Sequence, residues 1–145
     1  MASDITCALC GETPSGFRRE VIRVGNTTQW CCKSCSKAAA DLSDEELCRK
    51  VLRLGFAQEP EKVEAHLEFI DEAKQVRPSC LRCGTPLKFR KIVYLDRTPF
   101  SDSILSNTFD LLPAVCPACH KIEFYSPDLT DQVEKFLYLY RQDTD

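Results

Sequence analysis

The sequence predicts a small α+β fold that depends on metal ions, with two four-cysteine zinc modules joined by a helical middle and followed by a C-terminal helix. Three observations lead to this prediction. The chain has 145 residues and ten of them are cysteines. Eight of the cysteines form four C-x-x-C pairs, each of which holds two thiolates on one tight turn. Helical periodicity separates the second pair from the third and also follows the fourth.

The four pairs predict two zinc sites, one in each half of the chain. The pairs are Cys7/Cys10, Cys32/Cys35, Cys80/Cys83 and Cys116/Cys119. Two such turns complete the tetrahedral four-thiolate site that Zn²⁺ takes in structural centres. Neither half is long enough to bury a self-sufficient core. Structural zinc supplies roughly 10–16 kcal/mol, comparable to the stability of a whole domain. We therefore expect two Zn²⁺ ions to decide whether the modules fold.

Other cysteine chemistry ranks behind zinc. Disulfides would need an oxidising compartment. Cys116 to His120 matches the C-x-x-C-H pattern of haem attachment, and an iron–sulfur cluster also accepts four thiolates. A dithiol redox enzyme would use one C-x-x-C pair in a thioredoxin-like context, which the sequence lacks.

The N-terminal module, residues 1–42, is expected to contain a hairpin between its two pairs. Residues 17–24 have strand character, residues 25–27 signal a turn, and the chain then returns to the second pair. Residues 34–42 look helical, which places a helix N-terminus beside the thiolates of that pair.

The helical middle, residues 43–77, opens with a capping box at Ser43. This first helix should end at Gly55, and Pro60 fits the first turn of a second helix. The sequence Arg77-Pro78-Ser79 makes the expected boundary with the second module.

The C-terminal part, residues 78–145, is expected to be a zinc ribbon with a terminal helix. Strands are predicted over 87–95, 109–115 and 122–125, with Pro113 indicating a sheet edge or a bulge. Residues 98–108 read as a loop with room for a short helix. The last helix carries an apolar stripe of Leu129, Val133, Phe136, Leu137 and Tyr140.

Four further cysteine and histidine residues could act as metal ligands or reactive groups. Cys31 is an alternative ligand to Cys32, but only Cys32 keeps the pair spacing. Cys48 reads as a small buried apolar residue. His66 reads as a surface or satisfied core histidine, since no ligand pair requires it. His120 reads as an exposed residue of the last metal-binding turn.

Two resemblances follow from these motifs. Cys80-Leu81-Arg82-Cys83-Gly84 together with Cys116 to Tyr125 resembles the zinc-ribbon class, in particular small bacterial two-knuckle zinc-ribbon proteins. That resemblance implies a three-stranded zinc ribbon with no established reaction. The N-terminal module looks like a treble-clef finger and is similar in plan to the zinc-binding domain of the ClpX unfoldase, which would imply dimerisation or adaptor binding.

Composition restricts the partners and the location. The net charge is −3, with residues 38–77 at net −4, so the chain should not bind a polyanion on net charge alone. No apolar run reaches the roughly 18 residues of a membrane span, and the first residues do not resemble a signal peptide. We expect a cytoplasmic protein that does not contact a membrane.

The sequence favours a non-catalytic binding protein. It contains none of the P-loop, nucleophile-elbow or H-E-x-x-H motifs, and four thiolates leave a zinc ion no open position. The first hypothesis is a protein-interaction or adaptor module, with a homodimer as one form. The alternative is a nucleic-acid-binding zinc ribbon that uses its basic and aromatic hairpins. The candidate partner-binding residues are Arg18, Arg19, Arg23, Lys88, Arg90 and Lys91.

Overall fold

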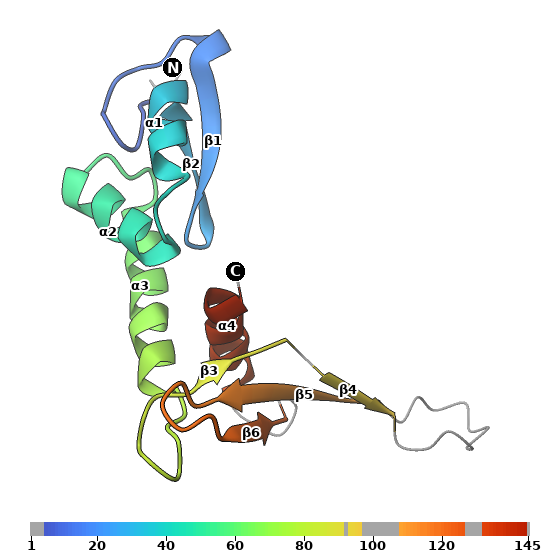
Figure 1. The fold of residues 1–145 in the computed structure, drawn as a ribbon. Coiled ribbons are helices and arrows are strands. Elements are labelled where there is room, and N and C mark those ends of the chain that lie inside the picture. The colour runs from blue at the N-terminus through green and yellow to red at the C-terminus, as the bar shows by residue number, and fades with distance from the viewer. Residues whose placement is uncertain (1–4, 92, 97–107, 127–131, 145) are drawn as a thin grey trace. The chain divides into compact units, whose positions relative to one another are not determined.

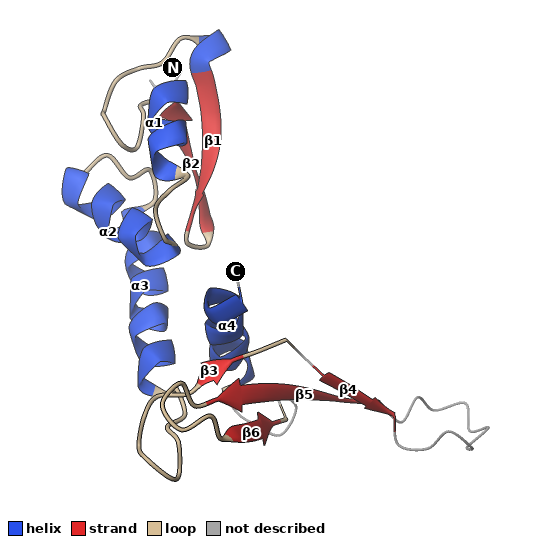
Figure 2. Cartoon of the chain, viewed as in Figure 1, coloured by secondary structure: helices blue, strands red, loops and turns tan. Residues whose placement is uncertain are grey.

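The structure, a computed structural model, describes residues 5–91, 93–96, 108–126 and 132–144. The chain divides into two compact units, Met1–Asp71 and Glu72–Asp145, called unit 1 and unit 2 below. The boundary falls inside helix α3 (Pro60–Gln75). Figure 2 shows that helices follow a single hairpin in unit 1 and that strands dominate unit 2.

Unit 1 begins with a hairpin and a short helix packed on it. A 3₁₀ turn (Gly16–Arg18) leads into β1 (Arg19–Val24), which pairs antiparallel with β2 (Thr27–Cys32). Gly25 takes φ +58° in the two-residue turn between them, a conformation that hairpin turns require and glycine adopts without strain. Helix α1 (Lys33–Ala39) lies against the hairpin (Figure 1). The predicted strand and helix are therefore present, with shifted ends.

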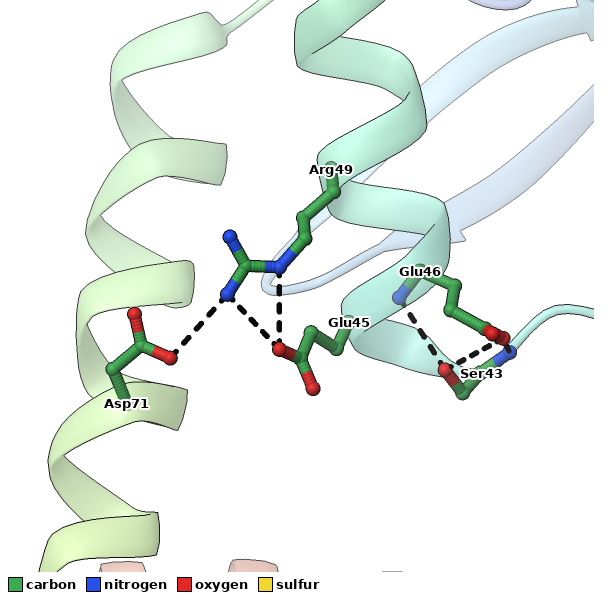
Figure 3. Close-up of polar contacts among 5 residues, drawn as sticks. All are labelled: Ser43, Glu45, Glu46, Arg49 and Asp71. Carbon is green, nitrogen blue, oxygen red and sulfur yellow. Dashed lines mark hydrogen bonds and ion pairs between the residues drawn. The ribbon is translucent and has the colours of Figure 1, made fainter.

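Helix α2 (Asp44–Leu54) has the predicted capping box. The Glu46 amide donates to Ser43 Oγ at 3.3 Å, and the Ser43 amide donates to Glu46 Oε2 at 3.0 Å (Figure 3). The helix ends at Gly55 with φ +75°, as predicted. These two reciprocal hydrogen bonds satisfy backbone donors that the helix itself cannot pair.

Helices α2 and α3 are joined by packing and by polar contacts, among them the hydrogen bond between Asp44 and His66 and an ion pair of Arg49. Arg49 of α2 lies 2.9 Å from Glu45 Oε1 and 3.4 Å from Asp71 Oδ1 of α3 (Figure 3). These groups are solvent-exposed, so this contact adds well under ~1 kcal/mol. The main stabilisation comes from a buried core that also contains cysteines: Cys7, Ala8, Leu9, Val24, Cys31, Ala39, Leu47, Cys48, Val51 and Val63.

Unit 2 is built around one long central strand. β5 (Thr108–Val115) pairs antiparallel with β3 (Lys88–Phe89) and β4 (Val93–Asp96) along one side and with β6 (Ile122–Tyr125) along the other. The prediction of one strand over 87–95 was wrong, because two short strands share that span. The sheet has four strands rather than three.

The interruption lies opposite Pro113. Pairing steps from Phe89↔Ala114 to Val93↔Leu111, so one side has one residue more than the other, which is a bulge. Proline lacks the N–H that a continuous ladder would need there, while its carbonyl still accepts from the Arg90 amide at 2.8 Å. The bulge predicted at Pro113 is therefore present, although β5 is central rather than an edge.

Helix α4 (Val133–Thr144) covers β3 and completes the core of unit 2 (Figure 1). The Phe136 ring lies 5.5 Å from the Phe89 ring and 5.8 Å from the Tyr125 ring. Asp143 receives hydrogen bonds from Arg77 Nη1 at 2.6 Å and from the Phe89 amide at 2.9 Å. Of the predicted apolar stripe, Phe136 and Tyr140 pack in the core of unit 2, together with the buried Leu139, which the prediction did not include. Leu129 and residues 98–107 of the loop predicted over 98–108 lie outside the described residues, whereas Thr108 begins β5.

Within the described ranges, no helix has the length and apolar character needed to cross a bilayer.

The capping box gives a direct test of how α2 is stabilised. We expect Ser43→Ala to lower the free energy of unfolding by about 0.5–2 kcal/mol, the usual cost of losing an N-cap side chain. Ser15→Ala is the matched control, because Ser15 precedes the 3₁₀ turn and its side chain makes no capping bond. Urea unfolding of both variants measures the difference, and equal losses would contradict the assignment.

Candidate metal centres

The first four-cysteine cluster lies in unit 1 and joins two distant segments. The sulfur atoms of Cys7, Cys10, Cys32 and Cys35 all lie within 4.8 Å of one another. Cys32 Sγ is 4.0 Å from Cys7 Sγ and 3.9 Å from Cys10 Sγ. The first pair precedes the hairpin and the second pair follows it, so β1 and β2 bring the two pairs together.

The second cluster has the same form in unit 2. The sulfur atoms of Cys80, Cys83, Cys116 and Cys119 also lie within 4.8 Å of one another. Cys83 Sγ is 3.4 Å from Cys116 Sγ and 3.8 Å from Cys119 Sγ, and Cys80 Sγ is 3.6 Å from Cys119 Sγ. Here β3, β5 and β6 position the two pairs at one end of the sheet.

These distances fit one metal ion per cluster. Zinc–sulfur bonds of about 2.3 Å in a tetrahedron place the sulfurs about 3.8 Å apart, which the distances of 3.4–4.0 Å bracket. A disulfide would need about 2.05 Å, and all ten cysteines are free thiols. Four sulfurs this close leave room for a single ion. Each cluster could therefore hold one Zn²⁺ with every ligand position supplied by cysteine.

Three of the four pairs share one backbone geometry. In each, the first cysteine donates its N–H to the carbonyl five residues later, and its own carbonyl accepts from the amide four residues later. These bonds are 2.8–2.9 Å long for the turns that start at Cys7, Cys80 and Cys116. The residue four positions on has positive φ in all three: Gly11 at +72°, Gly84 at +72° and His120 at +59°. His120 thus takes a backbone conformation that favours glycine.

The fourth pair is built differently. Cys32 caps α1, and Cys35 lies in its first turn. Ser36, at the position equivalent to His120, is helical. The Cys32 amide donates to Cys7 Sγ at 3.4 Å, which ties the helix to the first turn. Unit 1 therefore combines one tight turn with one helix N-terminus, while unit 2 uses two tight turns.

Hydroxyl groups favour the thiolate at one cysteine of each cluster. A hydrogen bond with Ser34, at 3.2 Å, lowers the pKa of the Cys32 thiol to about 6. The Thr85 hydroxyl, at 3.3 Å, lowers the pKa of Cys83 to about 6. Burial raises the pKa of Cys35 instead. Cys32 and Cys83 are therefore ready as thiolates at neutral pH, the form that binds a metal ion.

A basic cleft adjoins the first cluster. Its volume is about 640 Å³, and Cys32 forms part of its wall. Arg18, Lys33 and Lys37 line it together with Glu12. This places Arg18, one of the predicted partner-binding residues, beside two further cations.

Two cysteines lie outside both clusters, as the pair spacing predicts. Cys31 is fully buried on the inner face of β2, and burial raises the pKa of its thiol to about 11. Cys48 is fully buried on α2, and burial followed by the Asp44 charge raises its pKa to about 12. Both thiols are protonated at neutral pH. Cys32, not Cys31, lies among the ligand sulfurs.

The outer face of the unit 1 hairpin carries two of the predicted partner-binding residues. Arg19, Val21 and Arg23 alternate outward on β1, and Trp30 lies directly opposite Val21 on β2. Val21 is 53% exposed and Trp30 38% exposed. Trp30 therefore does not fill the small core beside the cysteines.

The outer face of the unit 2 sheet has a similar composition. Lys88, Val115 and Ile122 form one row across three strands, and Phe124 pairs with Pro113 in the next. Ile122 is 54% exposed and Phe124 59% exposed. Phe89 faces the other way and is buried, while the predicted partner-binding residues of this unit, Lys88, Arg90 and Lys91, are all exposed.

Comparisons with known proteins give no further guide: no protein-family model matches the chain, and neither does a curated protein or a solved structure.

The structure also brings together three residues that the sequence did not connect. Asp44 and Cys48 of α2 meet His66 of α3, with one ligand-type atom of each inside a 4.8 Å group. The four-residue spacing of Asp44 and Cys48 places both on one helix face, and this was the only part of the group that the sequence could indicate. The approach of His66 depends on how α2 packs against α3, which local sequence does not specify.

The shared turn geometry predicts that His120→Gly stabilises unit 2. An L-residue in this conformation costs roughly 1–2 kcal/mol, and the extra freedom of glycine in the unfolded chain offsets part of the gain. We expect the free energy of unfolding of the zinc-loaded protein to rise by a net amount of about 0.5–1 kcal/mol, measured by thermal unfolding. Ser36→Gly is the control: because Ser36 is helical, it should destabilise by about 0.5 kcal/mol. The same sign for both variants would contradict the difference between the two turns.

The hydroxyl contacts predict how acid releases the metal. Ser34→Ala removes the bond that lowers the Cys32 pKa, so protons compete with zinc at higher pH. We expect the midpoint of zinc release from unit 1 to move to higher pH, and the zinc affinity at neutral pH to fall about 10- to 100-fold. Ser36→Ala is the matched control, since its hydroxyl bonds to Cys31, which lies outside the cluster. Zinc release followed with a colorimetric chelator measures both, and an unchanged profile for Ser34→Ala would refute the role of this hydroxyl.

Proposed function

We propose that this chain is a non-catalytic protein with two structural zinc ions, acting as a binding module for a protein partner whose contact surface is apolar and acidic. The observation that carries the proposal is the composition of the two outer sheet faces. Each presents a half-exposed aromatic ring, a half-exposed aliphatic side chain and at least one cation. The residues are Arg19, Val21, Arg23 and Trp30 in unit 1, and Lys88, Ile122 and Phe124 in unit 2.

A structural role for the zinc follows from the ligand sets. All four positions in each cluster are cysteines, so a bound ion has no vacant position for a water or a substrate. Three of the cysteines, Cys7, Cys80 and Cys116, are also part of the buried cores. The ion thus joins chain segments and extends each core, and this supports a binding role rather than catalysis.

The composition of the faces suits a protein partner. Aromatic residues and arginine are enriched at the centres of protein interfaces. Burying what remains exposed of Ile122 and Phe124 would contribute on the order of 1 kcal/mol each. None of the outward residues named above carries a carboxylate, so an acidic rim on the partner would complement them. The basic cleft with Arg18, Lys33 and Lys37 offers a further place for an acidic side chain.

Single-stranded nucleic acid is the second candidate. Trp30 and Phe124 are exposed enough to stack on bases, and arginine and lysine lie beside them. The net charge of −3 opposes this reading, and each four-thiolate zinc centre adds a further two negative charges. Aliphatic Val21 and Ile122 add nothing to base stacking. For these reasons the protein partner ranks first.

The test compares capture by three forms of the zinc-loaded protein. The native chain, Phe124→Ser and Leu81→Ser are immobilised, and bound species are identified with and without nuclease, at low and at high salt. Leu81 is the matched control, because it is an apolar residue of the same unit, 85% exposed and outside the sheet. We expect a defined protein, bound equally by the native chain and Leu81→Ser, with about 10- to 30-fold weaker binding to Phe124→Ser. Nuclease should leave this binding unchanged.

Two results would overturn the proposal. Equal capture by Phe124→Ser and the native chain would remove the outer face of unit 2 from the binding surface. Capture that disappears with nuclease and falls steeply with salt would establish the nucleic-acid alternative.

A further inference from the structure

A third group of potential metal ligands lies in unit 1, separate from the four-cysteine cluster. Asp44 and Cys48 project from one face of α2, and His66 projects from α3 toward them. His66 Nε2 lies 2.7 Å from Asp44 Oδ2, and Cys48 Sγ lies 4.0 Å from Asp44 Oδ1. Nitrogen, oxygen and sulfur donors from two helices therefore converge on one point.

The surroundings hold these donors in place. Cys48 is fully buried and His66 is 7% exposed. The β1–β2 turn packs directly on the imidazole, because a Cβ on Gly25 would come within 2.6 Å of His66 Cδ2. The Phe69 ring stacks with the His66 imidazole, with 6.1 Å between the two ring centres. The Asp44 carboxylate is 29% exposed and provides a route to solvent.

The donor set selects the kind of ion. Imidazole and thiolate together suit Zn²⁺ or Co²⁺, whereas Mg²⁺ and Ca²⁺ require oxygen ligands. The thiolate and the carboxylate balance the two charges of such an ion. In a tetrahedral site the donor atoms would lie about 3.2–3.6 Å apart. His66 Nε2 and Asp44 Oδ2, now 2.7 Å apart, must therefore separate slightly, and Cys48 Sγ, now 4.0 Å from Asp44 Oδ1, must move closer to the carboxylate. The ion binds Nε2 of a neutral imidazole, whose proton is then carried by Nδ1, and the thiol proton of Cys48 is released to solvent.

We propose that Asp44, Cys48 and His66 form a third metal site, which binds one divalent transition-metal ion such as Zn²⁺ or Co²⁺ with water in the fourth position. With three protein ligands instead of four, it exchanges its ion more readily than the four-cysteine centres. Because its ligands come from α2 and α3, the bound ion fastens these helices to each other. The site is independent of the outer faces that the proposed function uses.

The simpler interpretation is that Asp44 and His66 form a structural hydrogen bond and that Cys48 only fills space in the core. The two interpretations differ in what Cys48 does. A filler residue tolerates serine or alanine without any change in metal content, whereas a ligand does not.

Cobalt binding to the full-length, zinc-loaded protein tests the proposal. Excess Co²⁺ is added in the presence of Mg²⁺, and bound cobalt and retained zinc are counted per chain after desalting. Thiolate-to-cobalt charge-transfer absorption is recorded in parallel. We expect one cobalt ion in addition to two retained zinc ions, together with a thiolate band. Cys48→Ser should abolish the band and weaken cobalt binding at least tenfold, while zinc content and circular dichroism stay unchanged.

Two variants complete the design. Asp44→Asn keeps the size of the side chain and removes its charge; it should also weaken cobalt binding, and it covers the case in which Cys48→Ser fails to fold. Cys31→Ser is the matched control, a buried cysteine outside all three groups, and should bind cobalt as the native chain does. Cobalt that replaces zinc one for one, or a thiolate band that survives both Cys48→Ser and Asp44→Asn, would overturn the proposal. Loss of zinc from the native chain without any cobalt bound in its place would contradict the structural centres instead, so the two failures are distinguishable.

Discussion

The convergence of four sulfur atoms in each unit is the constraint on which the rest of the structure depends. Ionised sulfurs about 4 Å apart repel one another by about 4 kcal/mol per pair at an effective dielectric constant of 20. A divalent ion would convert this repulsion into attraction and join segments that are 22 or more residues apart. Such centres supply roughly 10–16 kcal/mol, against the 5–15 kcal/mol that a whole domain typically has. The arrangement of the sheets, the covering helices and the exposed faces depends on the four sulfurs of each cluster being held together.

Local sequence predicted the parts of the centres that depend on local geometry. The C-x-x-C spacing and Gly11 and Gly84 identify tight turns, and the capping box at Ser43 identifies the start of α2. His120 and Ser36 occupy equivalent places in the sequence, each directly after the second cysteine of its pair. The structure separates them, because His120 takes positive φ in a tight turn while Ser36 lies in α1. What decides this is the helix that begins at the second pair, and only its rough position could be predicted.

The features that sequence missed depend on contacts between distant elements. Strand character runs through residues 87–95, but the bulge opposite Pro113 divides it into β3 and β4. Trp30 could have filled a small core, but the register with Val21 places it on the outer face. His66 reads as an ordinary histidine until α3 packs on α2 and brings it to Asp44. Register and helix packing are set by the whole unit, so no local pattern encodes them.

The position of the exposed apolar side chains argues for binding. The buried cores lie on the inner faces of the sheets: the unit 1 hairpin contacts α1 and α2, the unit 2 sheet contacts α4, and a four-cysteine cluster closes one end of each. Side chains that stay exposed on the outer faces contribute little to folding, and polar residues would serve there equally well in water. Trp30, Ile122 and Phe124 occupy them nonetheless, at a cost in hydration. Large apolar groups that share an exposed face support the interaction surface proposed above, whereas singly scattered ones require no such explanation.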